Sequence, residues 1–169
     1  MTTKTKAFET KDALDLYKKI IYTEGKAGRR MDKKQIEEMI DLAIKQLGYS
    51  YAPYSHFHVG AALLAKNGTY YTGCNIENAA FTPTNCAERT AIFKAVSEGN
   101  TQFDKIAIVG GKKDAQSLDY CTPCGVCRQV MTEFVDVDNF QIILAKNENE
   151  YKVYSLNELF PLNFGPKDL

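Results

Sequence analysis

The chain has 169 residues, 44% of them hydrophobic, and this length suits one domain with its own core. Lysine and arginine number 21, as do aspartate and glutamate, so the formal net charge is zero. Proteins that bind long nucleic acids usually carry a basic excess, so this balance argues against such a partner. The sequence has no apolar run long enough to cross a bilayer, and residues 1–10 lack the apolar segment of a secretory signal. We therefore expect a cytoplasmic protein that is not attached to a membrane.

The first helical pattern lies near the N-terminus. Apolar residues at helical spacing from Ala13 to Ile21 predict a short helix, which glycines after Glu24 interrupt. We predict that residues 1–30 are a leader, a short helix or partly disordered, without chemistry of its own. Residues 31–169 then form the functional domain.

The regular part of the chain begins with a helix and a hairpin. Apolar residues from Ile36 to Leu47 form one stripe, with Asp32 and Gln35 as a capping box and Gly48 as the end. Strands are expected over 57–65 and 69–75, because an Asn-Gly pair at 67–68 is typical of a tight hairpin.

Two more helices and three strands follow. One helix is expected from near Cys86 to Gly99 with Asn85 as its cap, and another begins at 122–123 with Pro123 in its first turn. In the latter, the residues expected to face inward are Val126, Val130, Met131 and Phe134. Strands are expected over 106–109, 141–145 and 151–154. This order predicts a mixed sheet with helices packed on its faces.

Three cysteines at the two later helix starts carry the strongest chemical signal. Cys124 and Cys127 are three residues apart, so they share one face of a helix and can bind one ion. Cys86 also lies in a first helical turn, where free amide hydrogens favour thiolates. Three thiolates leave the fourth tetrahedral position of zinc open for water, as in a catalytic site.

Glu88 follows the first of these cysteines by two residues. Zinc lowers the pKa of a bound water from about 15.7 towards about 7, and a carboxylate that is not a ligand must then move the proton. Glu88 is placed to do this. Its alternative role is structural, as the partner of Asn85 in a capping box.

Cys121 leaves a second metal site open. The spacing of Cys121, Cys124 and Cys127 also resembles the start of an iron–sulfur cluster motif. With Cys86, the three could instead close a four-cysteine structural zinc site. Because Pro123 separates Cys121 from the helix start, we expect Cys121 to lie outside the metal site. Cys74 falls in a strand and is expected in the core.

Together these residues resemble a known family, the small homotetrameric zinc-dependent cytidine deaminases of the cytidine/deoxycytidylate deaminase superfamily. The resemblance runs from Asp32 to Leu169. The stretches that carry it are YAPYSHFHVGAALL at 51–64, GCNIENAA at 73–80, NCAERTA at 85–91, FKAVSEG at 93–99, PCGVCRQV at 123–130 and LFPLNFGPKDL at 159–169.

The resemblance implies a three-layer α/β fold, with a mixed five-stranded sheet and helices on both faces. It implies one Zn²⁺ per subunit and a homotetramer with shared active sites. The expected reaction is hydrolytic deamination of cytidine and 2′-deoxycytidine to uridine and 2′-deoxyuridine, with release of ammonia. Glu88 would be the catalytic proton shuttle in pyrimidine salvage.

The resemblance also implies residues that bind the nucleoside. Asn75 and Glu77 match positions that bind the ribose hydroxyls, and Phe57 matches an aromatic residue that packs against the pyrimidine. Turn bonds for Asn75 and Glu77, and a core role for Phe57, are the structural alternatives.

Four further positions have counterparts in the family. Ala87 matches a residue whose backbone amide meets the substrate, and Arg89 matches an arginine that hydrogen-bonds the ligand sulfurs and offsets their charge. Phe81 and Phe164 match residues that neighbouring subunits contribute to the pocket. Arg128 could assist Arg89 in offsetting the charge of the ligand sulfurs, but we expect it on the helix surface facing solvent.

Two other functions stay open at this point. The first is a structural zinc or iron–sulfur interaction module with Cys121 as a further ligand. The second is a deaminase of a related nucleoside such as blasticidin S, or of a cytosine within a polynucleotide. The zero net charge argues against the polynucleotide, and the Asn75-Ile76-Glu77 motif and the Phe164-Gly165-Pro166 ending argue against blasticidin S.

Overall fold

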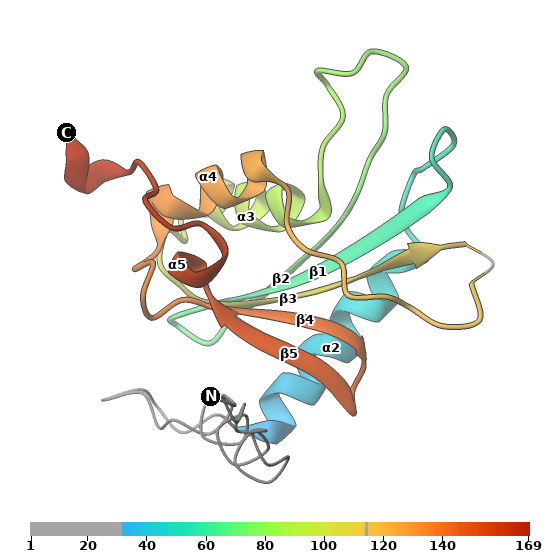
Figure 1. Cartoon of the computed structure of the whole chain (residues 1–169), viewed down its shortest axis with the longest axis horizontal. Coiled ribbons are helices and arrows are strands. Elements are labelled where there is room, and N and C mark those ends of the chain that lie inside the picture. Colours follow the sequence, from blue (N-terminus) through green and yellow to red (C-terminus); the bar gives the residue numbers. More distant parts are fainter. Residues whose placement is uncertain (1–31, 114) are drawn as a thin grey trace, which may run out of the picture. The chain divides into compact units, whose positions relative to one another are not determined.

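The computed structural model describes residues 32–113 and 115–169. The helix expected within the leader, and the domain boundary at residue 31, lie outside the described residues. The elements in chain order are α2 (Lys33–Leu47), β1 (Phe57–Ala65), β2 (Tyr70–Cys74), α3 (Ala87–Ser97), β3 (Phe103–Lys112), α4 (Gly125–Phe134), β4 (Gln141–Asn147), β5 (Glu150–Ser155), α5 (Leu156–Leu159) and a terminal 3₁₀ turn, Pro166–Asp168 (Figure 1).

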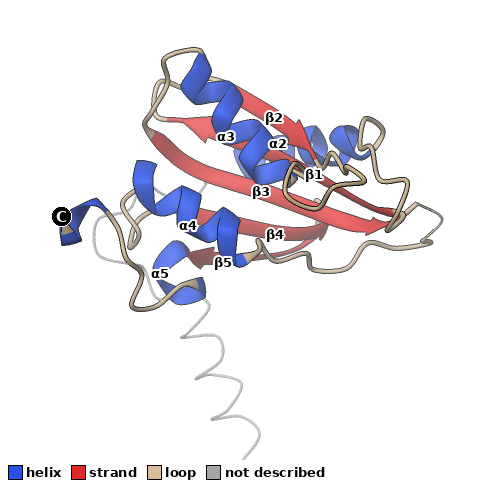
Figure 2. Ribbon diagram, turned by 90° about the horizontal axis from the view of Figure 1, so that it is seen from above, coloured by secondary structure: helices blue, strands red, loops and turns tan. Residues whose placement is uncertain are grey.

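The strands form one five-stranded mixed sheet in the order β2-β1-β3-β4-β5. The pairs β1–β2, β1–β3 and β4–β5 are antiparallel, whereas β3 and β4 run parallel and are joined by the crossover helix α4. Parallel neighbours need such a crossover, since a tight hairpin reverses the chain. The predicted three-layer fold, with helices on both faces of a five-stranded sheet, is confirmed (Figure 2).

Helix α2 covers one face of the sheet. Its buried stripe, which starts at Ile36 and ends at Ala43, packs on the alternate residues of β1, β3 and β4 that point to this side. At Gly60 a β-carbon would stand 2.0 Å from the carbonyl oxygen of Ala43, so only glycine lets the helix come this close. Asp32 is the N-cap of α2, as predicted, and its side chain accepts a hydrogen bond from the amide of Lys34.

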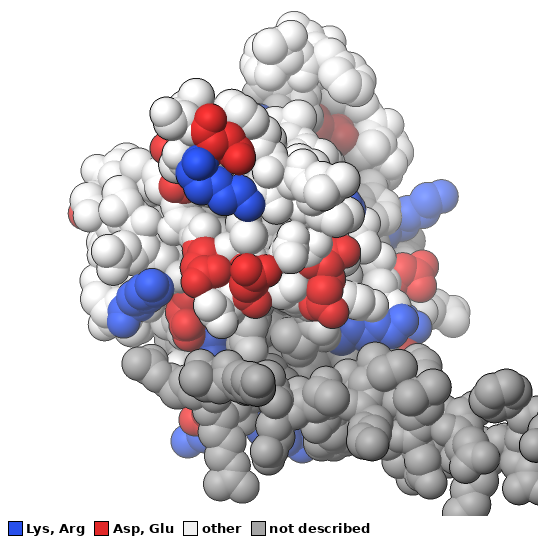
Figure 3. Space-filling model, turned by 60° about the vertical axis from the view of Figure 1, so that its left-hand side comes forward, with Lys and Arg blue, Asp and Glu red and all other residues white. Residues whose placement is uncertain are grey.

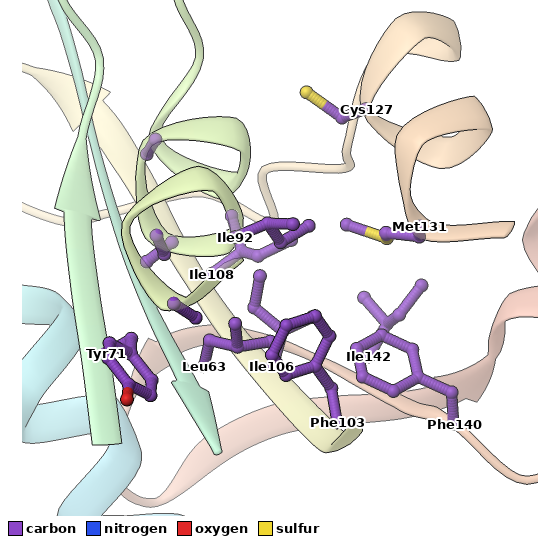
Figure 4. Close-up of a cluster of buried hydrophobic side chains, with 14 of the residues drawn as sticks. Leu63, Tyr71, Ile92, Phe103, Ile106, Ile108, Cys127, Met131, Phe140 and Ile142 are labelled. Atoms are coloured by element: carbon purple, nitrogen blue, oxygen red, sulfur yellow. The ribbon is translucent and has the colours of Figure 1, made fainter. Parts of the chain in front are cut away.

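Helices α3 and α4 cover the opposite face. Their buried residues share a core with the other side chains of β1, β3 and β4, and with Leu156 of α5. Figure 4 shows Met131 of α4 directed into this core, beside Ile108 and Ile142. Cys127, one turn earlier, lies at its border, and its sulfur points away from the apolar side chains. The two helix starts therefore lie at one edge of a well-packed core.

Several predicted details were wrong. Cys86 rather than Asn85 is the N-cap of α3, and α4 begins at Gly125, so Pro123 lies before the helix. Val126 is exposed rather than inward. Gln35 accepts a hydrogen bond from Lys105 at 3.1 Å instead of completing a capping box. Strand β3 extends well beyond both ends of its predicted range.

The surface agrees with a balanced charge. On the face that Figure 3 displays, uncharged residues cover most of the described area, acidic side chains form a row, and lysine and arginine are scattered. Among the helices of residues 32–113 and 115–169, none is long and apolar enough to cross a membrane.

Candidate active site

Two helix starts converge at the edge of the α3–α4 core. Cys86 is the N-cap of α3, Cys124 is the N-cap of α4, and Cys127 lies in the first turn of α4. The Cys124 sulfur accepts a hydrogen bond from the Cys127 amide at 3.4 Å, in place of the usual oxygen cap. The positive ends of two helix dipoles therefore meet at the sulfur group, an electrostatic setting that favours thiolates.

The spacing of the three sulfurs fits a tetrahedral metal ion. The Cys86 and Cys124 sulfurs are 3.8 Å apart, those of Cys124 and Cys127 are 3.4 Å apart, and all three lie within 4.8 Å of one another. Zn–S bonds of about 2.3 Å at tetrahedral angles place two sulfurs about 3.8 Å apart. The donor set and its spacing thus suit Zn²⁺ and supply three of its four ligands.

Cys121 lies outside this group. Among the described residues, the cluster able to hold a metal consists of Cys86, Cys124 and Cys127. The Cys121 sulfur instead packs on the backbone of Gly110, 2.9 Å from where a β-carbon would stand. Burial raises the pKa of the Cys121 thiol to about 12. The arrangement supports the prediction that Cys121 is not a ligand and argues against a closed four-cysteine site.

Hydrogen bonding divides the charge among the sulfurs unequally. The Cys127 thiol, and then Arg89, lower the pKa of Cys86 to about 5, although burial opposes this. The bond to Cys86, together with burial, raises the pKa of Cys127. Cys86 is thus ready to bind a cation as a thiolate, whereas Cys127 must release a proton when it binds one.

Arg89 lies beside the sulfurs, in the first turn of α3. One of its guanidinium nitrogens donates to the Thr84 carbonyl at 3.1 Å and contacts the Cys86 sulfur at 3.9 Å. Burial opposes its charge, but the bond to Cys86 and the charge on that sulfur raise the pKa of Arg89 above its ordinary value. Its Nε is buried and has no hydrogen-bond partner among the described residues. A fixed cation therefore offsets part of the charge of three thiolates.

Glu88 is buried at the start of α3, with 4% of its surface exposed. Burial, with the nearby charge of Cys86 adding to it, raises the pKa of Glu88 to about 7. The capping-box alternative is wrong, because Cys86 is the N-cap and the Asn85 side chain donates to Thr90 instead. A carboxyl group that can hold or release a proton near neutral pH therefore lies close enough to Cys86 and Cys127 for both to affect its pKa.

Glycine at position 73 of β2 fixes where this helix turn sits. A β-carbon there would stand 2.5 Å from the Ala87 carbonyl oxygen and 2.6 Å from the Ala91 nitrogen. Helix α3 therefore rests directly on the strand backbone, and Ala87 is fully buried as its first residue. This contact sets the height of Glu88 above the sheet.

Asn75 and Glu77 follow β2 and make the turn bonds that were their structural alternative. The Asn75 carbonyl oxygen accepts from the Ser50 hydroxyl and, at 2.8 Å, from the Val59 amide, while its NH₂ group donates to the Phe57 carbonyl at 2.8 Å. An amide NH₂ has two donors, so one hydrogen is left to meet another acceptor. These bonds also fix which end of the amide faces outward.

Glu77 caps the turn before β1. One of its carboxylate oxygens accepts from the Tyr54 amide at 2.9 Å and from the Ser55 amide at 3.3 Å. The Ser55 hydroxyl and these amides lower the pKa of Glu77 below its usual range. Both amide bonds go to one oxygen, and a carboxylate has acceptor sites on two, so it can also accept from a hydroxyl group of a ligand.

The three predicted phenylalanines lie in different surroundings. Phe57 is half-buried at the start of β1, and its ring edge reaches the backbone of Gly110 beside Cys121. Phe81 is 96% exposed on the loop between β2 and α3, and Phe164 is 58% exposed in the C-terminal segment, residues 160–169. The structure therefore places the Phe57 ring over Gly110 of β3, beside Cys121, and turns the other two outward.

Sequence reasoning missed two contributors. Ser50 lies in the loop between α2 and β1, and it meets Asn75 because this loop runs beside the end of β2, where Tyr51 pairs with Ile76. Arg128 was expected to face solvent, but it is half-buried and its side chain bonds to two backbone carbonyls. Arg128 and Gln129 follow Cys127 within the stretch at 123–130 on which the family resemblance partly rests. That match was the signal that could have pointed to a role for Arg128.

Comparison with protein families places most of the described chain in one group. Residues 33–143 match the family described as "Cytidine and deoxycytidylate deaminase zinc-binding region". All three sulfurs, Glu88 and Arg89 fall within the matched range.

Individual relatives agree. A cytidine deaminase of Sporosarcina psychrophila is 43% identical over 134 residues, which are 79% of this chain and 94% of the relative. A probable cytidine deaminase of Dictyostelium discoideum is 41% identical over 82% of this chain and 90% of the relative. Among solved structures, the cytidine deaminase of Burkholderia pseudomallei aligns with a TM-score of 0.67 and 39% identity, covering 75% of this chain and 97% of that one.

Proposed function

The chain belongs to the cytidine and deoxycytidylate deaminase family, and on that premise we propose that it hydrolyses cytidine and 2′-deoxycytidine to uridine and 2′-deoxyuridine. The observation that carries this proposal is the group of three sulfurs with a buried carboxyl group beside it. Cys86, Cys124 and Cys127 would hold one zinc ion. When bound, zinc supplies Lewis-acid activation of a water molecule, whose pKa it lowers towards about 7.

Glu88 moves the protons of the reaction. It accepts a proton from the attacking water and delivers it to N3 of the pyrimidine ring while oxygen adds to C4. It then passes the second proton of that oxygen to the amino group, which leaves as ammonia as the carbonyl forms. A carboxyl group with a pKa of about 7 suits both directions of transfer.

Arg89 offsets the charge of the ligand sulfurs. Three thiolates exceed the charge of Zn²⁺ by one unit, and this excess would weaken the activation of water. The contact between the Arg89 guanidinium and the Cys86 sulfur supports this role.

Asn75, Glu77 and Phe57 hold the nucleoside. The outward N–H of Asn75 donates to a sugar hydroxyl, and the second oxygen of Glu77 accepts from one. Both can bind the 3′-hydroxyl, so loss of the 2′-hydroxyl is tolerated. The Phe57 ring packs against the pyrimidine, and the backbone amide of Ala87 meets its carbonyl group.

We also propose a homotetramer in which neighbouring subunits complete each pocket. The support is the outward position of Phe81 and Phe164, which in one subunit contact little of the described chain. Exposed aromatic residues of this kind are typical of interfaces. The three ligands must be reduced thiols, which a cytoplasmic location would maintain.

Ammonia release tests the function directly. We expect turnover of cytidine and 2′-deoxycytidine, with little on free cytosine or on 2′-deoxycytidine 5′-monophosphate. One zinc per subunit should be measured in the same preparation. If one zinc per subunit is found but neither nucleoside is turned over, the metal site is supported and the proposed substrates are refuted.

A further inference from the structure

Arg128 connects two distant parts of the chain at the edge of the active site. Its Nε donates to the Pro123 carbonyl at 2.8 Å, and one terminal nitrogen donates to the Leu159 carbonyl at 2.6 Å. Pro123 immediately precedes the ligand Cys124, and Leu159 is the last residue of α5. The guanidinium therefore bridges the turn of residues 123–127, here the ligand turn, and the helix from which the C-terminal segment departs.

The bond to Pro123 controls the orientation of the ligand turn. Helix α4 begins at Gly125, and the Cys124 carbonyl already accepts from the Arg128 amide at 3.0 Å. The Pro123 carbonyl lies outside this ladder, and proline has no amide hydrogen of its own. The side chain of Arg128 thus fixes the peptide plane between Pro123 and Cys124, and a rotation of that plane would move the Cys124 sulfur.

The bond to Leu159 belongs to a set of polar contacts between α4 and the C-terminal segment. The Phe164 carbonyl accepts from Gln129 at 2.9 Å and from Thr132 at 3.3 Å. A cavity of about 420 Å³ lies between the end of α4 and residues 163–167, and Leu162 and Leu169 are fully exposed. Apolar packing is therefore slight there, and hydrogen bonds from α4 hold the segment, which Figures 1 and 2 show leaving α5.

We propose that Arg128 is a positioning residue that holds Cys124 for the metal and ties the ligand turn to the C-terminal segment. This proposal rests on the zinc site of the proposed function. It adds a residue that acts by fixing the position of a ligand and does not itself contact the metal. A planar guanidinium with several fixed donors can bond two carbonyls at once, whereas a lysine ammonium at the same position presents its donors from one point.

The experiment compares Arg128→Lys and Arg128→Gln with Gln129→Ala, which removes a contact to Phe164 and leaves the bridge to Pro123 intact. Zinc release to a chromogenic chelator is timed for each purified full-length protein. We expect release to accelerate about 10- to 100-fold in both Arg128 variants, the usual effect of losing a group that orients a ligand. Lysine should not rescue, and Gln129→Ala should release zinc at the unmodified rate.

Cobalt supplies a readout of the ligand geometry. In Co²⁺-substituted protein the visible and near-ultraviolet bands depend on the number of thiolates and on tetrahedral geometry. We expect these bands to weaken or shift in both Arg128 variants and to be unchanged in Gln129→Ala. If Arg128→Gln fails to fold, Arg128→Lys, which keeps the stem and the charge, decides the outcome.

Three results would overturn the inference. The first is zinc release at the same rate in the Arg128 variants and the unmodified protein. The second is unchanged cobalt bands in both Arg128 variants. The third is zinc release from Gln129→Ala as fast as from the Arg128 variants. If the unmodified protein binds no zinc at all, the proposed function fails first and the role of Arg128 fails with it. Normal zinc in that protein with unaffected variants refutes the positioning role alone.

Discussion

The sulfurs of Cys86 and Cys124 lie 3.8 Å apart although 38 residues separate them in the chain. Each cysteine is the N-cap of a helix, and both helices pack on the same face of the sheet. The crossover between the parallel strands β3 and β4 sets α4 beside α3. The metal site is therefore a product of sheet topology, and local sequence contributes only the residue types at two helix starts.

Removing the charge of Glu88 should stop turnover without removing the metal. In Glu88→Gln we expect kcat to fall about 10²- to 10⁴-fold, the usual contribution of a proton-transferring group. Glutamine has nearly the same shape and cannot carry the proton. Turnover is followed by ammonia release and zinc by elemental analysis. A variant with full zinc and near-normal kcat would remove Glu88 from the mechanism.

Replacement by alanine should remove zinc at Cys124 but not at Cys121, three residues earlier. Cys124→Ala removes one of three sulfurs and should lose zinc and activity together. Cys121→Ala should keep one zinc per subunit, because its sulfur packs on Gly110 outside the metal group. Metal content of both variants, purified side by side, checks this. Loss of zinc in Cys121→Ala would restore the four-cysteine alternative.

Elements with a strong local pattern could be predicted from the sequence. The apolar stripe from Ile36 gave α2, and the Asn-Gly pair gave the hairpin of β1 and β2. The three-sulfur group was predictable because two of its members share one helical turn and the third precedes a second helix. The position of the cap of α3 was not, since cysteine is not among the preferred N-cap residues and Asn85 is.

Contacts between distant segments could not be predicted. The spacing of Cys121, Cys124 and Cys127 is regular, so only the packing of Cys121 on Gly110 separates it from the ligands. The two carbonyls that Arg128 binds include one 31 residues away, and helical spacing alone placed this side chain in solvent. Helix α5 has four residues, too few for a periodic pattern, although its Ser155–Glu158 capping box was readable.

A side chain at position 73 should push α3 off the sheet. In Gly73→Ala the new β-carbon would meet backbone atoms of α3 at 2.5 and 2.6 Å, which cannot move without shifting the helix. Overpacking of this kind costs about 1–3 kcal/mol. Gly48→Ala is the matched control, because its β-carbon would meet its nearest neighbour at an ordinary 3.6 Å. Denaturant unfolding at one protein concentration should show a lower midpoint for Gly73→Ala only.

The proposed sharing of pockets between subunits makes a prediction that no single-subunit site would satisfy. Glu88→Gln lacks the residue that we propose as the proton shuttle, and Phe164→Ala lacks one that we propose a neighbour supplies. Each should be poorly active alone. When the two are co-expressed, a Phe164→Ala subunit with its own Glu88 can sit beside a Glu88→Gln subunit that supplies Phe164, so intact pockets form in the mixed oligomer.

We therefore expect the co-expressed mixture to exceed the summed activity of its parents, measured as ammonia release per subunit. Glu88→Gln co-expressed with Cys86→Ala is the matched control for subunit exchange. Cys86 and Glu88 both lie at the start of α3, so the same subunit contributes both to a pocket. Each pocket of this control mixture therefore lacks one of the two residues, and mixing cannot build an intact site. Activity of the first mixture no greater than that sum, in oligomers shown to contain both chains, would mean that each Phe164 serves its own subunit. Its outward position, 58% exposed in a single subunit, would then need another explanation.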